Sequence, residues 1–288
     1  MAREDPRQAG GNCELPLCGE PSTAAVGRIG GTRVHLSSLL VDLGDNPDRP
    51  RPGRLWLRNR YRVHQRLCMA FPSLAAKADD PAFLKPYSPG SFTHVHGPRS
   101  ELQAFLFRVD PQPGNRALIL VQSATRPDWE YAFQNAGYLL AAPPQVQPYD
   151  PLFEAGQAWR FRLLANPTKR LREASLGPDG KLINPELWKN LKGKGKRVPV
   201  PRGMLQDWLM RRAGDAGFRV VRLYNVQPGY LYVAKNGEGT GTRLRSAQYD
   251  GILEVTDPQS FRHAFIHGIG PGKAFGFGLV SVRPIPGG

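Results

Sequence analysis

Two side chains suited to proton transfer lie three residues apart in the first quarter of the chain. Tyr61 and His64 occur in the sequence TyrArgValHisGln, and residues at this spacing share one face of a helix. Histidine transfers protons near neutral pH, and a tyrosine hydroxyl both donates and accepts hydrogen bonds. The pair indicates general acid–base chemistry, although the same spacing is common on helix surfaces and in cores that do no chemistry.

Three arginines crowd the same segment: Arg60, Arg62 and Arg66. Guanidinium groups bind phosphate oxygens through paired hydrogen bonds, so we expect these three residues to bind RNA and a phosphodiester to be the substrate. A metal-free ribonuclease needs a group that deprotonates or orients a ribose 2′-hydroxyl, a proton donor for the leaving 5′-oxygen, and cations around the phosphate. This segment offers all three kinds of group.

A glycine-rich stretch with one lysine follows the last helical segment, within HisGlyIleGlyProGlyLysAlaPheGlyPheGlyLeu (267–279). Its glycines and lysine are Gly268, Gly270, Gly272, Gly276, Gly278 and Lys273. Glycine permits positive φ and close backbone approach to a ligand, so we expect a phosphate-binding loop, with a simple chain reversal as the alternative. It is not a nucleotide P-loop, because Lys273 is followed by Ala274 and strand-like residues, so ATP is a poor candidate ligand.

Patterns that bind metals are weak in this chain. His263 and His267 are four residues apart but lack the intervening Glu of a zinc metalloprotease. Cys13 and Cys18 have no second Cys or His pair at a suitable spacing, and the acidic residues form no convincing carboxylate set. We therefore expect no metal and no other cofactor, and we read Cys68 as a small buried residue rather than a nucleophile.

The elements that must position these residues occur in two similar series. In the first half we expect a strand at about 32–42, a helical segment at 57–71, and paired strands at 104–109 and 117–123. In the second half we expect a strand containing Trp159, Phe161 and Leu163, then a helix at 203–212, strands at 218–226, 230–234 and 243–255, a helix at 258–267, and a closing strand through 282. The fold class is α+β, with two tandem ferredoxin-like β-α-β-β-α-β domains.

Composition places the domain boundaries. Residues 1–31 are rich in Gly, Pro and small polar residues and are expected to be a flexible leader. ProTyrAspPro (148–151) punctuates the chain, so we expect one domain over 32–150 and a second, with the glycine-rich loop, over 151–288. Residues 77–100 read as an insertion.

The charge of the chain favours a nucleic-acid partner. It has 288 residues with 39 basic and 24 acidic side chains, a formal charge of +15, although a merely solubilising surface is the alternative. Arg160 and Arg162 alternate with apolar residues and would give one strand a cationic face. The candidate RNA-binding residues outside the first helix and the loop are Arg160, Arg162, Lys169, Arg170, Lys194, Lys196, Arg197, Arg243 and Arg245.

Cysteine usage and hydropathy indicate the compartment. Only three cysteines are present, so a disulfide scaffold is not expected and a reduced setting fits. No apolar run approaches the ~20 residues that span a bilayer. We expect a soluble cytoplasmic protein with no membrane partner.

The order of these motifs resembles that of the CasE family of CRISPR-associated endoribonucleases, within the RAMP superfamily. The resemblance covers about 32–284, and its motifs are specific only in combination. They are TyrArgValHisGln (61–65), ValGlnSer (121–123), PheArgLeuLeuAlaAsnProThrLys (161–169), LysArgValProVal (196–200), the TrpLeu helix (208–209) and the glycine-rich motif (267–279). The leader at 1–31 and the insertion at 77–100 depart from the family pattern.

The resemblance implies a function. Such a protein would bind the CRISPR repeat RNA hairpin of pre-crRNA and cleave it once, without metal, at the 3′ base of the stem. Attack by the 2′-hydroxyl would leave a 5′-hydroxyl and a 2′,3′-cyclic phosphate, and the protein would retain the mature crRNA in the type I-E Cascade complex with its other subunits. Tyr61 and His64 match the active-site positions of the family, and the six loop residues match its glycine-rich loop.

Two other function classes compete with this one. A non-catalytic RAMP-type RNA-binding subunit of a CRISPR effector complex would share the fold, charge and loop, but Tyr61 with His64 argues against it. A regulator that binds duplex DNA would need a helix-turn-helix motif, which we do not find in the sequence.

Overall fold

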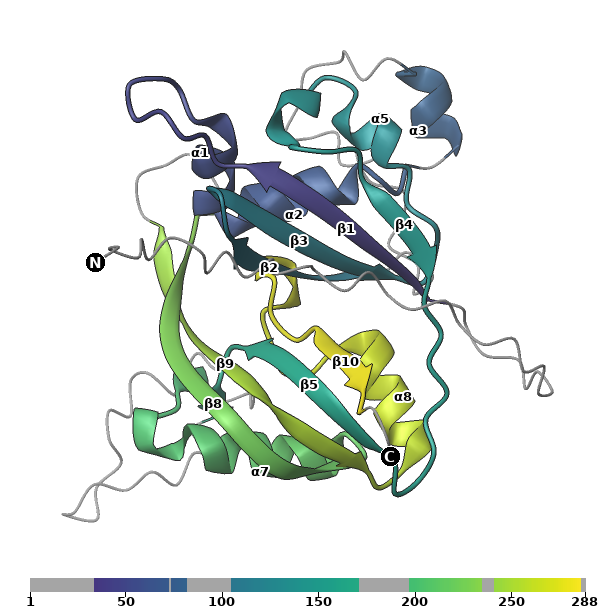
Figure 1. Ribbon diagram of the computed structural model, residues 1–288, viewed down its shortest axis with the longest axis vertical. Coiled ribbons are helices and arrows are strands. Elements are labelled where there is room, and N and C mark those ends of the chain that lie inside the picture. The colour runs from purple at the N-terminus through teal and green to yellow at the C-terminus, as the bar shows by residue number, and fades with distance from the viewer. Residues whose placement is uncertain (1–33, 73, 82–104, 171–196, 235–240, 286–288) are drawn as a thin grey trace, which may run out of the picture. The chain divides into compact units, whose positions relative to one another are not determined.

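Two four-stranded antiparallel sheets, each covered by helices on one face, form most of the described chain (Figure 1). The computed structural model describes residues 34–72, 74–81, 105–170, 197–234 and 241–285. Residues 33–288 cluster as one compact unit. The expected leader, most of the insertion, and Lys194 and Lys196 lie outside the described residues.

The first sheet has the strand order β2-β3-β1-β4. Its strands are β1 (His35–Asp42), β2 (Phe105–Gln112), β3 (Arg116–Ser123) and β4 (Gln145–Pro148). Between β1 and β2 the chain forms α1 (Pro52–Arg58), α2 (Arg60–Cys68) and α3 (Leu74–Asp79), and between β3 and β4 it forms α5 (Trp129–Phe133) and the short 3-10 helix η2 (Gly137–Leu139). This order is the ferredoxin-like topology.

The core of the first sheet lies between its strands and α2. Val63 and Leu67, four residues apart on α2, are fully buried and pack with residues of the strands such as Phe107, Ile119 and Val121. Burial of a large apolar side chain contributes about 1.5–3 kcal/mol, so this contact holds α2 on the sheet.

The second sheet repeats the topology with the order β10-β5-β9-β8. Its strands are β5 (Ala158–Ala165), β8 (Phe218–Val233), β9 (Thr242–Val255) and β10 (Val280–Pro284). The small sheet of β6 (Thr168–Arg170) and β7 (Arg197–Pro199), the 3-10 helix η3 (Arg202–Met204) and α7 (Leu205–Asp215) precede β8, whereas α8 (Pro258–His267) and the 3-10 helix η4 (Lys273–Phe275) precede β10. Trp208 and Leu209 of α7 and Phe261 and Phe265 of α8 enter its core.

The ferredoxin-like fold class is confirmed, but several element bounds differ from expectation. The helix expected at 57–71 is two helices that meet at Asn59, which has extended backbone angles. The strands expected at 218–226 and 230–234 form the single strand β8, which crosses Pro228 and Gly229. β8 lies at the edge of its sheet, where a proline removes no essential hydrogen bond. The expected β-α-β-β-α-β topology includes a second helix and a fourth strand in the first half, which we did not place in the sequence and which are α5 and β4.

Polar contacts join the two sheets. Gln122 of β3 donates a hydrogen bond of 2.6 Å from its amide nitrogen to the carbonyl of Phe265 in α8. ProTyrAspPro (148–151) begins with the last residue of β4 and precedes β5, and within it the Tyr149 hydroxyl donates to the carbonyl of Val282 in β10. The proposed boundary there stays a prediction. Within the described residues, no helix is long and apolar enough to cross a membrane.

Candidate active site

The helix α2 carries Tyr61 and His64, and its start is fixed by Asn59. The Asn59 side-chain oxygen accepts a hydrogen bond of 3.1 Å from the Tyr61 backbone N–H, as a helix N-cap does. The same side chain donates to the carbonyl of Ala234 at 2.9 Å and accepts from its N–H at 3.2 Å, directly after β8. Asn59 therefore fixes the first turn of α2 and, with it, the direction of the Tyr61 side chain.

Tyr61 and His64 lie on one face of α2, as the sequence predicts. Their ring centroids are 6.3 Å apart, close enough for one phosphodiester to contact both. The His64 ring stacks on Phe105 at 5.4 Å and on Phe107 at 6.4 Å. Both side chains are only partly buried, so the aromatic residues of β2 hold the imidazole plane while the pair stays accessible.

Cys68 is buried one turn after His64, with its sulfur 3.6 Å from the imidazole Nε2. This burial agrees with the interpretation of Cys68 as a small packed residue. It limits the space on one side of the ring, so Cys68 and the two phenylalanines together restrict His64 to few orientations.

The glycine-rich loop approaches this face of α2. Phe275 in η4 lies 6.2 Å from the Tyr61 ring, measured between centroids. All five glycines have positive φ, as expected: Gly268, Gly270, Gly272, Gly276 and Gly278. At Gly276 the requirement is also steric, because a Cβ atom there would lie 3.0 Å from the Phe107 ring that stacks on His64.

Lys273 begins η4 and is exposed, and partial desolvation lowers the pKa of its ammonium group. The backbone N–H groups of Lys273 and Ala274 have no backbone acceptor among the described residues, whereas those of Phe275 and Gly276 do. The loop thus presents a cation and two unused donors beside α2, a combination suited to an anion.

Comparison with known proteins identifies the family. A family described as CRISPR associated protein matches residues 34–284. CRISPR-associated endoribonuclease Cse3 of Thermus thermophilus is 35% identical over 194 residues, which are 63% of this chain and 81% of that protein. The chain belongs to the CRISPR-associated endoribonuclease family. The CRISPR system Cascade subunit CasE of Escherichia coli is 25% identical over 238 residues, 81% of this chain and 96% of the relative.

A solved structure of the family agrees with the fold. Thermus thermophilus Cse3 bound to an RNA representing a pre-cleavage complex is 27% identical, with a TM-score of 0.58, covering 88% of this chain and all of that one. The resemblance to this endoribonuclease family inferred from the motifs is confirmed.

The arginines of α2 separate in this family member. Arg62 is exposed beside Tyr61. Arg66 points to α5 instead, where it donates to the Ala132 carbonyl and the Asn135 side chain, both at 3.0 Å, and burial lowers its pKa. Arg60 lies on another side of α2, where burial lowers its pKa to about 10 despite the opposing influence of Asp110. The structure does not bring the three together around one phosphate.

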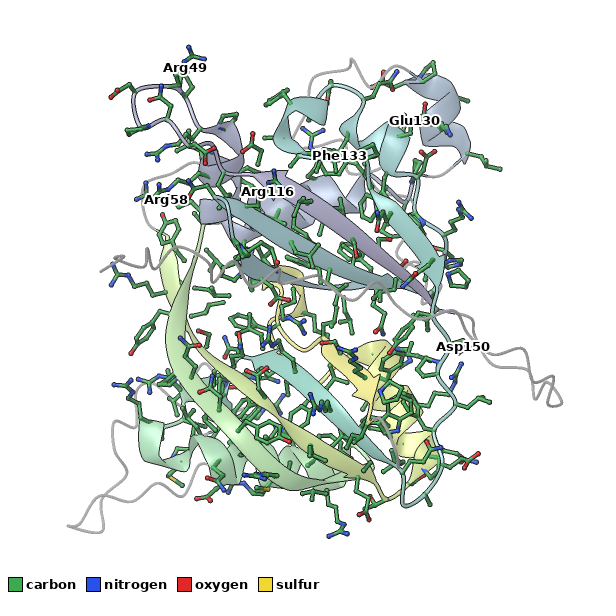
Figure 2. The ribbon with its side chains drawn as sticks, viewed as in Figure 1. Arg49, Arg58, Arg116, Glu130, Phe133 and Asp150 are labelled. Atoms are coloured by element: carbon green, nitrogen blue, oxygen red, sulfur yellow. The ribbon has the colours of Figure 1, made fainter. Side chains whose placement is uncertain are left out.

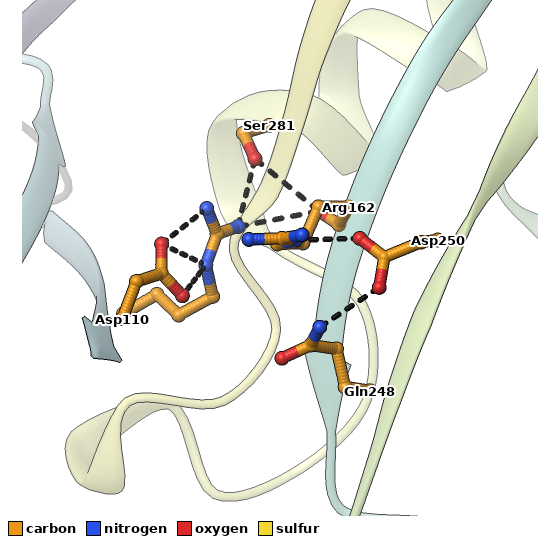
Figure 3. Close-up of polar contacts among 6 residues, drawn as sticks. Asp110, Arg162, Gln248, Asp250 and Ser281 are labelled. Carbon is orange, nitrogen blue, oxygen red and sulfur yellow. Dashed lines mark hydrogen bonds and ion pairs between the residues drawn. The ribbon is translucent and has the colours of Figure 1, made fainter. Parts of the chain in front are cut away.

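The cationic face expected on β5 is present but partly neutralised. Trp159, Phe161 and Leu163 are buried, and Arg160 and Arg162 are exposed on the opposite face of the strand. The Arg162 side chain forms an ion pair with Asp250 of β9, and Gln248 also donates to Asp250 (Figure 3). Arg162 is thus partly neutralised by a carboxylate, whereas Arg160 forms no ion pair with another described residue.

A buried arginine of β2 lies next to this face. Arg108 holds Asp110 through hydrogen bonds of 2.8–3.0 Å, and it also donates to the Ser281 hydroxyl of β10 at 2.7 Å and to the Arg162 carbonyl at 3.3 Å (Figure 3). Arg108 is 4% exposed and Asp110 is 7% exposed. The Arg108 side chain therefore joins the first sheet to the second through Ser281 and the Arg162 carbonyl.

The remaining expected RNA ligands lie on the small sheet of β6 and β7 and on β9. Lys169 and Arg170 of β6, Arg197 of β7 and Arg243 of β9 are exposed. Arg245 donates to the Val200 carbonyl and to the Tyr230 hydroxyl, so it packs a tyrosine that is 62% exposed. Arg243 is opposite Tyr232 of β8, two residues before the Ala234 that bonds Asn59 at the start of α2. The binding of RNA by all these residues stays a prediction.

Sequence reasoning missed the aromatic support of His64. Phe105 and Phe107 alternate along β2, which predicts that they share one face, but nothing in the sequence shows that α2 covers that face. Among the described residues, no three His, Cys, Asp or Glu side chains come together in an arrangement that could hold a metal ion.

Proposed function

We propose that this protein binds the CRISPR repeat hairpin of pre-crRNA and cleaves it at the 3′ base of the stem, with Tyr61 and His64 as the catalytic pair. The observation that carries the proposal is their position one helical turn apart, accessible, beside a loop with a lysine and unused N–H donors. Membership of the CRISPR-associated endoribonuclease family supports it.

The chemistry needs no group beyond these side chains. The ribose 2′-oxygen, on losing its proton to a base, attacks the adjacent phosphorus, and the bond from phosphorus to the 5′-oxygen breaks as that oxygen takes a proton from an acid. The products are a 2′,3′-cyclic phosphate and a 5′-hydroxyl. Tyr61 and His64 supply the base and the acid, and the pair's geometry leaves both assignments open.

Positioning explains why the aromatic residues and the loop accompany the pair. Phe105 and Phe107 keep the His64 ring in one plane, so little orientational freedom is lost when substrate binds. Lys273 and the nearby N–H groups would stabilise charge on the non-bridging oxygens as it develops. The other cationic side chains would hold the stem through its phosphates, as A-form RNA is recognised mainly by shape and backbone.

The same proposal extends to assembly and compartment. The Escherichia coli relative is named a Cascade subunit, and we infer that this chain also keeps its cleaved RNA and enters a Cascade complex. Because its substrate is a transcript, we place the reaction in the cytoplasm.

The test is cleavage of a labelled repeat-hairpin RNA in excess EDTA, with the end groups of the products mapped. We expect His64→Ala to slow cleavage by roughly 10²–10⁴-fold, the usual contribution of a general acid or base, while hairpin affinity stays within about twofold. His263→Ala is the matched control, because His263 is an exposed histidine on α8.

Each other outcome changes the conclusion. Tight binding without cleavage by wild type would support a non-catalytic RNA-binding subunit. Cleavage only after metal is restored would overturn the proposed chemistry, and equal affinity for duplex DNA would favour a DNA-binding regulator. Parallel loss of affinity and unfolding temperature in His64→Ala would mean that His64 is structural.

A further inference from the structure

An arginine-rich pocket lies on the side of α2 away from the glycine-rich loop. It has a volume of about 720 Å³, and the described residues that line it include five arginines and no acidic residue. The arginines are Arg49, Arg51, Arg54, Arg58 and Arg60. They come from the loop after β1, from α1 and from the first residue of α2, and Figure 2 shows Arg49 on that loop and Arg58 at the end of α1.

These arginines have no carboxylate partners among the residues that the structure describes. None of the five forms an ion pair with another described residue. Three carboxylates precede them, Asp42 at the end of β1 and Asp45 and Asp48 in the loop. Asp42 accepts from the Gly44 N–H and Asp45 accepts from the Asn115 side chain, and none of the three forms an ion pair with another described residue. Five positive charges that converge on one hollow repel one another, so an anion that enters it would be stabilised by all of them.

Arg60 gives the pocket a buried donor. Its Nη1 atom is shielded from solvent and has no hydrogen-bond partner among the described residues. The one carboxylate that acts on it, Asp110, is already held by Arg108. An unsatisfied buried guanidinium donor costs free energy, so its retention in a pocket lined by four more arginines favours a ligand that the described residues do not supply.

The pocket adjoins the start of α2, the helix that carries the catalytic pair. Arg60, the first residue of α2, lines the pocket, and Tyr61 is the next residue of the same helix. Consecutive Cα atoms are about 3.8 Å apart, so neighbouring nucleotides of one RNA strand can contact Tyr61 and the pocket.

We propose that this pocket binds backbone phosphates of the single-stranded RNA that flanks the hairpin next to the cleaved bond. The inference rests on the proposed function and adds a second element to the substrate: the flank, recognised by charge and not by base sequence. Arginine suits this role because its planar donors bind phosphate oxygens in pairs.

Affinity measurements with three RNAs test the proposal: the hairpin alone, the hairpin with a 5′ flank, and the hairpin with a 3′ flank. Each carries a 2′-deoxy sugar at the cleavage site, so that binding is measured without cleavage. The double variant Arg54→Gln with Arg58→Gln changes two exposed side chains of the pocket. Its matched control, Arg211→Gln with Arg212→Gln, removes the same charge from α7.

We expect the pocket variant to bind the RNA with the 3′ flank about tenfold more weakly, because the cleaved bond lies at the 3′ base of the stem, and to bind the hairpin alone unchanged. For that flanked RNA the slope of log affinity against log salt should fall by about 0.7 for each lost phosphate contact. Arg60→Gln should have the same selectivity for flanked RNA. The α7 control should not distinguish flanked RNA from the hairpin alone.

Equal weakening of all three RNAs would overturn the proposal, because the pocket would then serve the hairpin. Unchanged RNA binding with loss of co-assembly would also overturn it, in favour of an acidic protein partner. A wild-type protein that fails to bind the hairpin alone would instead refute the proposed function, so the two failures are distinguishable.

Discussion

Replacing Arg108 with Met should destabilise the protein strongly, because it leaves the Asp110 carboxylate buried without its partner. Only 5% of the Arg108 side chain and 10% of the Asp110 side chain are exposed, so water cannot replace the lost hydrogen bonds. Removing one member of a buried ion pair costs about 3–5 kcal/mol. Ser281 and the Arg162 carbonyl also lose a donor, while the charge of Arg60 partly compensates, so we expect about 3 kcal/mol.

The double variant Arg108→Met with Asp110→Leu isolates the cause. It removes both charges and fills the space with apolar atoms, and such replacements of buried pairs are often neutral or stabilising. We therefore expect the second substitution to recover most of the stability that the first one loses.

Urea unfolding followed by circular dichroism measures the stability of both variants. A change in stability appears as a shift of the urea concentration at the midpoint, with no change in the slope of the unfolding free energy against urea concentration. A matched control is Arg212→Met, which removes an exposed arginine that pairs with Asp215 and should cost less than about 1 kcal/mol. The reasoning would be refuted if Arg108→Met cost less than about 1 kcal/mol, or if the double variant were no more stable than the single one.

Three further predictions follow from single residues. Gly276→Ala should lower the cleavage rate more than the hairpin affinity. The φ of 85° costs a non-glycine residue about 1–2 kcal/mol, and the added Cβ would contact the Phe107 ring under His64. Single-turnover kinetics and equilibrium binding measure the two effects. Arg60→Met should raise the unfolding temperature of the RNA-free protein, since burial of the Arg60 charge lowers its pKa to about 10. Asp257→Asn should lower the unfolding temperature above pH 4, because hydrogen bonds from Ser260 lower the Asp257 pKa, and the difference from wild type should vanish as pH falls through that lowered pKa.

Local signals in the sequence account for the parts of the fold that were predicted well. The alternation of Trp159, Phe161 and Leu163 with arginines gives β5 with the expected buried face. The bounds of α8 match the expected helix, because Asp257 caps it and Pro258 occupies its first turn.

Tertiary contacts account for the parts that were missed. The helix break at Asn59 depends on Ala234, which is 175 residues away in the sequence. No local sequence pattern predicts that contact. The partners of Arg66 and Arg162 likewise lie far off in the sequence, on α5 and β9. Arginine type and spacing predict an anion site in general, but only the folded chain shows that carboxylates and carbonyls already occupy some of these arginines.

The pocket arginines show the same limit. Residues 46–54 are rich in Pro, Arg and Gly, a composition typical of a loop, but α1 begins within them at Pro52. Gly53 permits this helix to lie against the end of β1, since a Cβ there would overlap the Asp42 carbonyl. The packing of α1 against β1 brings these arginines close to Arg60. Their spacing in the sequence does not predict this.

The Asn59 side chain ties the start of α2 to Ala234 through two hydrogen bonds while it also caps the helix. Ser or Thr could cap the helix in place of Asn59. Their side chains are too short to reach Ala234, and they lack the amide group that donates to the Ala234 carbonyl and accepts from its N–H. Residue 59 and the length of β8 should therefore vary together during evolution. Homologues with a shorter β8 are expected to use Ser, Thr or Asp at this position, whereas those whose strand ends directly before the position of Ala234 should keep an amide.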